Sequence, residues 1–155
     1  MKVLIVYDSF FGNTEKIAEY IKEILEDKHE VVIKKAKKFE ETDFTNVEAV
    51  IIGSPTRAFR PTKDINGILS KYAIQIKELK AAAFDTRIDY DTVKPKTLSM
   101  MMKRSGYAAE KINKKLEKIG AEIIEKPTGF YVKDSEGPLL KGEKDKAQRW
   151  LKKLL

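Results

Sequence analysis

Hydroxyl, amide and glycine residues gather in one turn near the start of the chain. The turn, DSFFGNT at residues 8–14, lies between an entirely apolar run and a segment with helical spacing. A helix that starts near Thr14 would direct its unpaired N–H groups and the positive end of its dipole at the turn. Ser9 and Asn13 add neutral donors, and Gly12 lets the backbone adopt a positive φ or approach an oxyanion closely. The turn therefore has the chemistry of an anion site.

Helix capping explains the same turn without a ligand. Asn13 or Thr14 could cap the helix while Gly12 only makes the turn, and taken alone this explanation is at least as good. Two further loops favour a site: GSPTRAFRPT at residues 53–62 and DTRIDY at residues 85–90. Each follows an apolar run, and parallel strands place such loops at one edge of the sheet, where open α/β sheets bind ligands.

Strands and helices are predicted to alternate along nearly the whole chain. Short apolar runs rich in β-branched residues predict five strands, at residues 3–7, 31–33, 49–52, 81–84 and 123–124, the last continuing at 130–132. Apolar residues three or four apart predict helices over residues 17–25, 65–79, 109–119 and 147–154. This alternation indicates a parallel sheet covered on both faces, and Pro127 places the last strand at an edge.

Length and composition indicate one globular domain over residues 1–155. Hydrophobic residues make up 42% and charged residues 35% of the chain, and no apolar run approaches the ~20 residues that a membrane-spanning helix needs. We therefore expect no membrane insertion. The N-terminus lacks the pattern of a secretory signal, so a cytoplasmic location is expected.

Several classes of chemistry have no residues to support them. The chain has no cysteine and a single histidine, His29, so we expect no metal site, no thiol chemistry and no Ser-His-Asp triad. The motifs G-x-x-x-x-G-K-[ST] and G-x-G-x-x-G are also absent. The net charge of +7 favours anionic ligands or acidic partners. The lysine cluster at residues 34–38 has no interleaved aromatics, so we do not expect nucleic acid as a partner.

Four stretches of the sequence resemble the flavodoxin family. KVLIVYDSFFGNTEKIAEYI resembles that family's first strand, FMN-phosphate loop and first helix. AVIIGSPTRAF resembles its third strand and second flavin loop, and AAAFDTR its fourth strand and third flavin loop. KKLEKIGAEII resembles the following helix and edge strand. The resemblance implies a three-layer, doubly wound α/β fold with a five-stranded parallel sheet in the order 2-1-3-4-5, and non-covalently bound FMN.

The resemblance also implies a set of FMN contacts in the three loops. They are Ser9, Phe10, Phe11, Gly12, Asn13, Thr14, Pro55, Thr56, Arg57, Ala58, Phe59, Asp85, Thr86, Arg87 and Tyr90. Ser9 to Thr14 would hold the phosphate. Arg57 stands where many flavodoxins have a tryptophan, so Phe59 and Tyr90 are the rings available for flavin stacking; loop packing explains each of them equally well. No residue is expected to act as an acid or base.

The implied function is electron transfer between redox partners, with an acidic partner surface expected because this chain is basic. Arg57, Arg60 and Arg87 are predicted near the cofactor, and positive charge there would stabilise the reduced, anionic flavin. We therefore hypothesise a less negative potential than in acidic flavodoxins. Two alternatives remain: an FMN-dependent oxidoreductase of the quinone reductase or protoporphyrinogen oxidase type, and an interaction module of this fold without flavin.

One connection is unexpectedly apolar. Residues 98–102, LSMMM, lie between the third predicted flavin loop and the next helix. Methionine adapts to irregular surfaces, so a partner or dimer contact is one explanation. We expect burial beneath a neighbouring loop instead.

Overall fold

A six-stranded parallel sheet forms the centre of the computed structural model, which describes residues 1–153. Its strands are β1 (Lys2–Tyr7), β2 (Glu30–Lys35), β3 (Ala49–Pro55), β4 (Lys80–Ile88), β5 (Glu122–Ile123) and β6 (Thr128–Val132). They are arranged in the order β2-β1-β3-β4-β5, and β6 also pairs with β4. Every ladder is parallel. The predicted order 2-1-3-4-5 is therefore confirmed.

The fifth predicted strand is divided into two pieces. β5 pairs with the start of β4, at Lys80 and Ala81, whereas β6 pairs with its second half from Phe84 to Ile88. Pro127 lies in the gap between the two pieces. Proline has no N–H to donate to a ladder, so it interrupts pairing and is tolerated only at such an edge.

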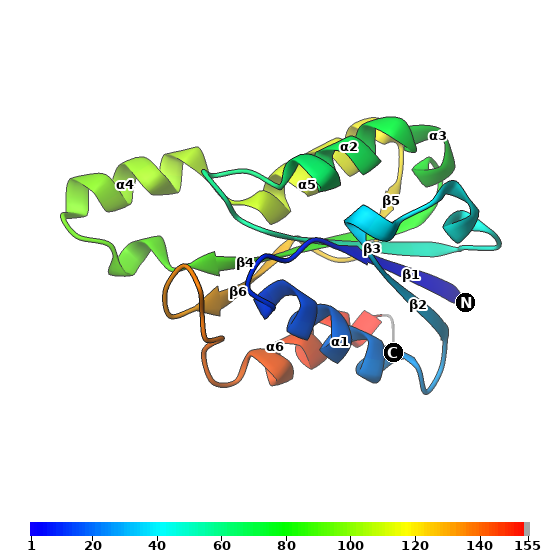
Figure 1. Ribbon diagram of the computed structural model, residues 1–155, viewed down its shortest axis with the longest axis horizontal. Coiled ribbons are helices and arrows are strands. Elements are labelled where there is room, and N and C mark those ends of the chain that lie inside the picture. The colour runs from blue at the N-terminus through cyan, green and yellow to red at the C-terminus, as the bar shows by residue number, and fades with distance from the viewer. Residues whose placement is uncertain (154–155) are drawn as a thin grey trace.

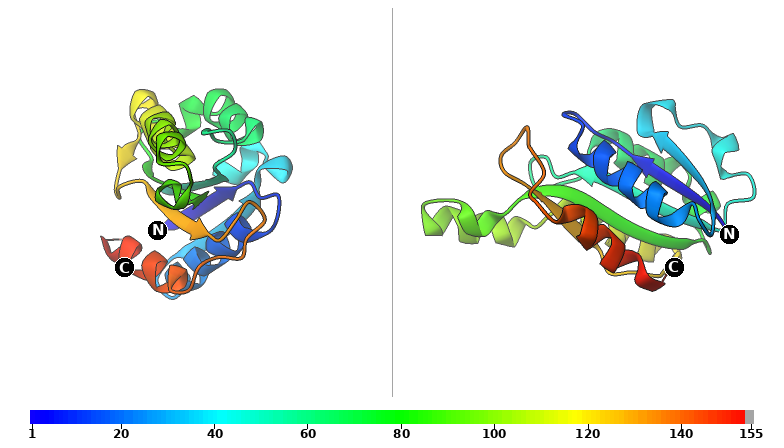
Figure 2. Two further views of the ribbon diagram at one scale, coloured as in Figure 1. Left: turned by 90° about the vertical axis from the view of Figure 1, so that its left-hand side faces the viewer. Right: turned by 90° about the horizontal axis from the view of Figure 1, so that it is seen from below.

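Helices cover both faces of the sheet (Figure 1). They are α1 (Asn13–Leu25), α2 (Lys63–Lys71), α3 (Ala73–Ile76), α4 (Lys96–Ser105), α5 (Ala108–Ile119) and α6 (Glu143–Trp150), with 3₁₀ turns η1 (Ala36–Lys38), η2 (Glu41–Phe44), η3 (Tyr90–Thr92) and η4 (Leu151–Lys153). Figures 1 and 2 show α1 and α6 on one face and α2 and α5 on the other. The predicted three layers are therefore present.

Two predicted helices have different bounds in the structure. The helix predicted over residues 65–79 is divided at Tyr72 into α2 and α3. The helix predicted over residues 147–154 begins earlier, at Glu143, and continues as η4. Its last predicted residue, Leu154, lies outside the described residues.

Alternation along β1 divides the core into two layers. Val3 and Ile5 pack with α1 and α6 residues, whereas Leu4 and Val6 pack with residues of α2 and α5. All four side chains are fully buried. A strand buried on both faces reads as a continuous apolar run, which is why the opening segment is uniformly apolar. The buried sheet holds the ends of β1, β3 and β4 at one edge.

The expectation that residues 98–102 are buried beneath a loop is wrong. These residues belong to α4, which projects from the body of the molecule (Figures 1 and 2). Leu98, Met100 and Met101 are 38%, 62% and 61% exposed. Only Ser99 is buried among the five, and its hydroxyl donates to the carbonyl oxygen of Tyr90. The contacts of α4 with η3 give it one anchored side and leave Met100 and Met101 in solvent.

Within residues 1–153, none of the helices combines the length and the hydrophobicity that crossing a bilayer requires.

Candidate functional site

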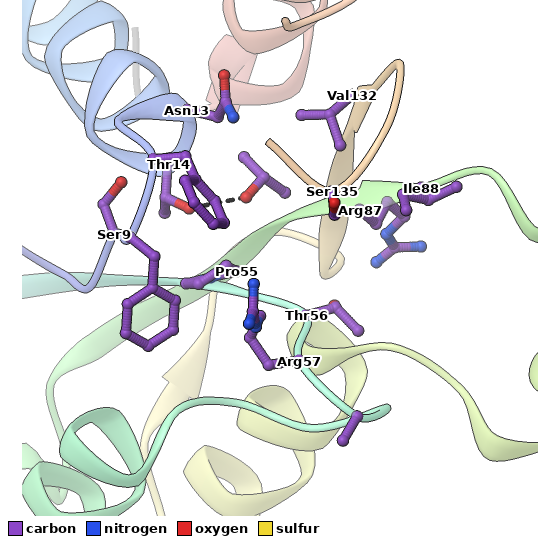
Figure 3. Close-up of a pocket in the computed structure, with 14 residues that line it drawn as sticks. Ser9, Asn13, Thr14, Pro55, Thr56, Arg57, Arg87, Ile88, Val132 and Ser135 are labelled. Carbon is purple, nitrogen blue, oxygen red and sulfur yellow. Dashed lines mark hydrogen bonds between the residues drawn. The ribbon is translucent and has the colours of Figure 1, made fainter. Parts of the chain in front are cut away.

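A cavity of about 410 Å³ lies where β1, β3, β4 and β6 end (Figure 3). Its walls come from all three loops that the sequence singled out and from the segment after β6. The lining residues are Ser9, Phe10, Phe11, Asn13, Thr14, Pro55, Thr56, Arg57, Ala58, Thr86, Arg87, Ile88, Val132 and Ser135. A volume of this size falls within the roughly 300–1,000 Å³ of small-ligand and cofactor sites.

The turn after β1 forms one end of the cavity. Gly12 has φ of 87° and is the N-cap residue of α1, and its N–H donates to Ser9 Oγ at 3.1 Å. The capping alternative is not observed, because no side chain caps α1. Asn13 instead donates from Nδ2 to the carbonyl oxygen of Glu136 at 3.0 Å. The first turn of α1 therefore has no side-chain acceptor for its amide hydrogens, which leaves them available to an anion.

The Thr14 and Thr86 hydroxyls connect this turn to β4. Their Oγ1 atoms lie 2.7 Å apart, and both side chains are buried. Figure 3 shows this bond in the cavity wall. In this bond one hydroxyl donates its hydrogen and the other accepts it. The accepting hydroxyl can still donate its own hydrogen to a ligand, and the remaining lone pairs of both oxygens can accept.

The turn after β3 forms the second wall. Thr56 is anchored twice: its N–H donates to the carbonyl oxygen of Thr86 at 2.9 Å, and its Oγ1 accepts from Ala108 N at 2.9 Å. Arg57 extends towards the first turn, where its guanidinium carbon lies 5.1 Å from the ring centre of Phe10 and 5.7 Å from that of Phe11. These are cation–π distances. Arg57 and the two phenylalanines therefore form a connected rim between two loops.

Arg87 is held in the floor of the cavity by two carboxylates. Its Nε and Nη2 donate to the two oxygens of Asp85, each at 2.7 Å, and Nη2 also contacts Glu110 at 3.2 Å. Its guanidinium carbon lies 3.7 Å from the ring centre of Tyr107. Burial opposes the charge, but Asp85 and Glu110 raise the pKa of the Arg87 guanidinium. Arg87 therefore stays charged, and its charge is already balanced by protein groups.

Asp85 lies behind the wall instead of in it. Its side chain is fully buried, and one of its oxygens also accepts from Ala109 N at 2.8 Å. Burial raises the pKa of this carboxyl above its ordinary value, and the bonds from Arg87 and Ala109 only partly oppose that rise. Asp85 thus orients Arg87 and has no surface in the cavity.

The two predicted stacking rings do not line the cavity. Tyr90 is buried and stacks on Tyr107, with ring centres 4.1 Å apart and planes at 10°. Phe59 meets Tyr90 edge to face at 6.0 Å. Burial raises the pKa of Tyr90 to about 12. Gly12, Phe59, Asp85 and Tyr90 are the predicted contacts that the structure places outside the lining, and the roles of all the predicted residues in binding stay predictions.

Three lining residues were not predicted: Ile88, Val132 and Ser135. Ile88 extends β4 beyond the predicted strand, and Val132 ends β6. The segment after β6 is tied to the first turn, because Asn13 bonds to Glu136 and a Cβ on Gly137 would lie 2.7 Å from the Asn13 amide. The signal available in the sequence was the carboxyl end of the last strand, which in a parallel sheet points to the same edge.

No cluster of three or more His, Cys, Asp or Glu side chains suited to a metal ion occurs in the described part of the chain. The donors in the cavity are hydroxyls, amide hydrogens and the guanidinium groups of Arg57 and Arg87, a set that suits an anion.

Comparisons with known proteins agree with this architecture. The flavodoxin domain family matches residues 4–123. The structure is similar to the rubredoxin oxygen:oxidoreductase of the anaerobe Desulfovibrio gigas, with 21% identity and a TM-score of 0.76; the match covers 99% of this chain and 35% of that one. It is also similar to oxidised flavodoxin 1 of Bacillus cereus, with 17% identity and a TM-score of 0.75, covering 99% of this chain and 97% of the flavodoxin.

A flavodoxin from the domain Archaea has 20% identity and a TM-score of 0.72, and the match covers 99% of both chains. No curated protein sequence matches this chain. At these identities the structural likenesses show the fold alone, and the chain spans about a third of the Desulfovibrio protein. The family match, in contrast, covers most of the chain, from β1 to β5. The chain belongs to the flavodoxin family.

Proposed function

We propose that the protein binds FMN without a covalent bond in the cavity at the ends of β1, β3 and β4, and that it transfers electrons between redox partners. One observation carries the proposal: the first turn of α1 has no side-chain cap and opens onto a cavity lined by hydroxyls. The family match and the flavodoxins among the structural neighbours support it.

The phosphate would bind at the first turn of α1. Ser9 and Thr14 line that end of the cavity, with Thr86 beside them. The amide hydrogens of the turn would donate to the phosphate oxygens, and the helix dipole favours their negative charge. Gly12 allows the required backbone path, since its φ of 87° strains any residue with a Cβ.

The flavin ring would lie between the turns after β3 and β4. Pro55, Arg57 and Ala58 line one side, and Ile88 belongs to the other. Tyr90 is engaged with Tyr107, so we propose Arg57 as the group that covers the ring, through guanidinium–ring stacking. Bound FMN would supply the electron uptake and release. The chain's own residues would fix the ring, limit water at one face and set the local charge.

The partner proposed here is a redox protein with an acidic docking surface. The chain carries a net charge of +7, and opposite charge accelerates encounter between proteins. Phe10 and Phe11 are 55% and 49% exposed at the rim of the cavity, so apolar contact with a partner is available next to the cofactor.

The test separates a carrier from a stand-alone oxidoreductase. The purified chain is loaded with FMN, reduced by light, and mixed with an acidic redox protein or with NADPH and a quinone. We expect fast electron transfer to the acidic protein, slowed at high ionic strength. Rapid, repeated oxidation of NADPH by the quinone would contradict the carrier function and support an oxidoreductase.

A further inference from the structure

A second hollow, of about 680 Å³, adjoins the first cavity. It is bounded by the turn after β1, by η1 and by the segment that leads into α2. The two hollows share three lining residues, Phe10, Arg57 and Ala58. Arg57 and Ala58 belong to a turn in which the N–H of Arg57 donates to the carbonyl oxygen of Arg60 at 3.0 Å and the reverse bond measures 3.1 Å, whereas Phe10 comes from the turn after β1. Phe10 and Arg57 of the rim described above therefore form a wall between two spaces.

Cationic side chains outnumber carboxylates in the second hollow. Lys37, Arg57, Arg60 and Lys63 all line it. Within residues 1–153, none of these four forms an ion pair with a carboxylate. The nearby Lys34 differs, since it pairs with Asp43 at 3.1 Å.

Two carboxylates also line the hollow and leave it with an excess of positive charge. Asp8 is buried and accepts from Ser9 N at 2.9 Å, so part of its capacity is used within the turn. Asp64 lies in the first turn of α2, where the helix dipole already favours an acidic group. Four cations against two carboxylates in one concave space favour a ligand with more than one negative charge.

The hollow also offers apolar surface. The ring of Phe10 lies on the side shared with the first cavity, and Pro61 and Ala58 add apolar atoms. Sites that combine apolar walls with a few polar groups bind small organic molecules, and the volume lies within their usual range. A bare inorganic ion would leave most of this surface in water.

We propose that the second hollow binds a small organic anion that has at least two negative charges and an apolar body. Phosphate esters and polycarboxylates share this chemistry. The ligand's charged groups would contact Lys37, Arg60 and Lys63, and its body would lie on Phe10. Because Phe10 and Arg57 form the wall between the hollows, the ligand would lie beside the first cavity. The proposal does not depend on FMN binding, since Lys37, Arg60 and Lys63 do not line the first cavity.

The test uses the full chain saturated with FMN, so that the first cavity does not take up the probes. ADP, phthalate and uncharged adenosine are titrated separately by calorimetry. We expect saturable binding of ADP or phthalate, and no binding of adenosine at the same concentrations. Preference for ADP would identify the phosphate-ester class, and preference for phthalate the polycarboxylate class. Equal binding of ADP and adenosine would overturn the proposal.

Two double variants locate the site. The double variant Lys37→Glu and Arg60→Glu reverses two exposed charges of the hollow. It should lower the affinity for the anion by about tenfold or more, because each lost charge contact lowers the affinity by a few-fold. The double variant Lys114→Glu and Lys118→Glu makes the same change of net charge on the exposed side of α5. It should lower the affinity for the anion by about twofold at most. Equal losses in the two variants, or none in the first, would overturn the proposal.

The same titrations separate this proposal from the proposed function. Thr14→Val should weaken the binding of FMN and leave the binding of the anion unchanged. The Lys37→Glu and Arg60→Glu double variant should weaken the binding of the anion and leave the binding of FMN unchanged. If the chain takes up no FMN, the anion titrations are repeated without it. Loss of binding in the Lys37 and Arg60 double variant alone would then still support the second hollow.

Discussion

The Oγ1 atoms of Thr14 and Thr86 lie 2.7 Å apart, although 72 positions separate the two residues in the chain. Their bond joins the first residues of α1 to the carboxyl half of β4 and lies in the wall of the candidate cofactor cavity. Both side chains are buried. The pair therefore has two roles that can be measured separately: it links the elements of the fold, and it presents polar groups to a ligand.

Removing both hydroxyls of this pair should cost less than the sum of the costs of removing each one alone. Thr14→Val or Thr86→Val leaves the partner hydroxyl buried without its bond, which costs about 1–3 kcal/mol of unfolding free energy. The double variant removes both groups, so its cost should be smaller than the sum of the single costs. Urea unfolding of the three variants measures this. Strictly additive costs would show that the two hydroxyls do not stabilise each other.

Gly129 provides the space that Arg87 occupies. A Cβ at Gly129 would lie 1.8 Å from Arg87 Nε, and the Arg87 side chain is fixed by Asp85 at 2.7 Å. Gly129→Ala should therefore displace Arg87 from its carboxylate partner and lower the unfolding free energy by about 2–4 kcal/mol. Chemical denaturation of the purified variant checks the loss.

Gly67 is the matched control for that substitution. It lies within α2, and apart from its chain neighbours and the backbone of its own helix no atom lies within 4 Å of a Cβ built there. Gly67→Ala should raise the unfolding free energy by about 0.5–1 kcal/mol, because alanine is the better helix former. Similar losses for the two glycine substitutions would contradict the close approach at Gly129.

Arg57 should set the potential of a bound flavin more strongly than Arg60 or Arg87. Arg87 is balanced by Asp85 and Glu110, and Arg60 does not line the first cavity. Arg57→Gln should make the final reduction step more negative by roughly 40–90 mV, which corresponds to about 1–2 kcal/mol of lost charge attraction. Arg60→Gln is the control and should shift it by less than half as much. Equal shifts of the potential in Arg57→Gln and Arg60→Gln, measured by redox titration, would show that Arg57 does not have this role.

Alkaline pH should destabilise the fold through Tyr90. Burial raises the pKa of its hydroxyl from an ordinary value of 10.0 to about 12, so the neutral form is favoured in the folded chain. This contribution to stability is complete below pH 10 and is lost as pH rises from 10 to about 12. The unfolding free energy, measured with denaturant across that pH range, should fall less steeply for Tyr90→Phe than for the unchanged chain. Identical slopes would show that Tyr90 is not the responsible group.

Hydrophobic patterning identified the sheet because its central strands, β1, β3 and β4, are buried on both faces. Continuous apolar runs predicted β1 and β3, and the three-or-four spacing predicted α1 and α5 within a few residues. The helical spacing that follows the G-N-T turn predicted a start near Thr14, and α1 begins one residue earlier, at Asn13.

Other features depend on tertiary contacts that no local pattern contains. Residues 96–105 form α4 although three consecutive methionines, Met100 to Met102, gave no clear amphipathic pattern; Pro95 before it and Gly106 after it were the available boundary signals. Tyr90 stood at a position suited to flavin stacking, but Tyr107, seventeen residues later, holds its ring. Val132 and Ser135 line the cavity because β6 pairs with β4.

Comparing FMN with riboflavin tests the central claim most directly, because the two differ only by the phosphate that the first turn of α1 is proposed to hold. Each is titrated into the flavin-free chain and followed by quenching of flavin fluorescence. We expect FMN to bind at least about a hundredfold more tightly, as a phosphate receiving several charge-assisted hydrogen bonds requires, and Thr14→Val to narrow that difference. Equal affinities for FMN and riboflavin would contradict a phosphate site at this turn.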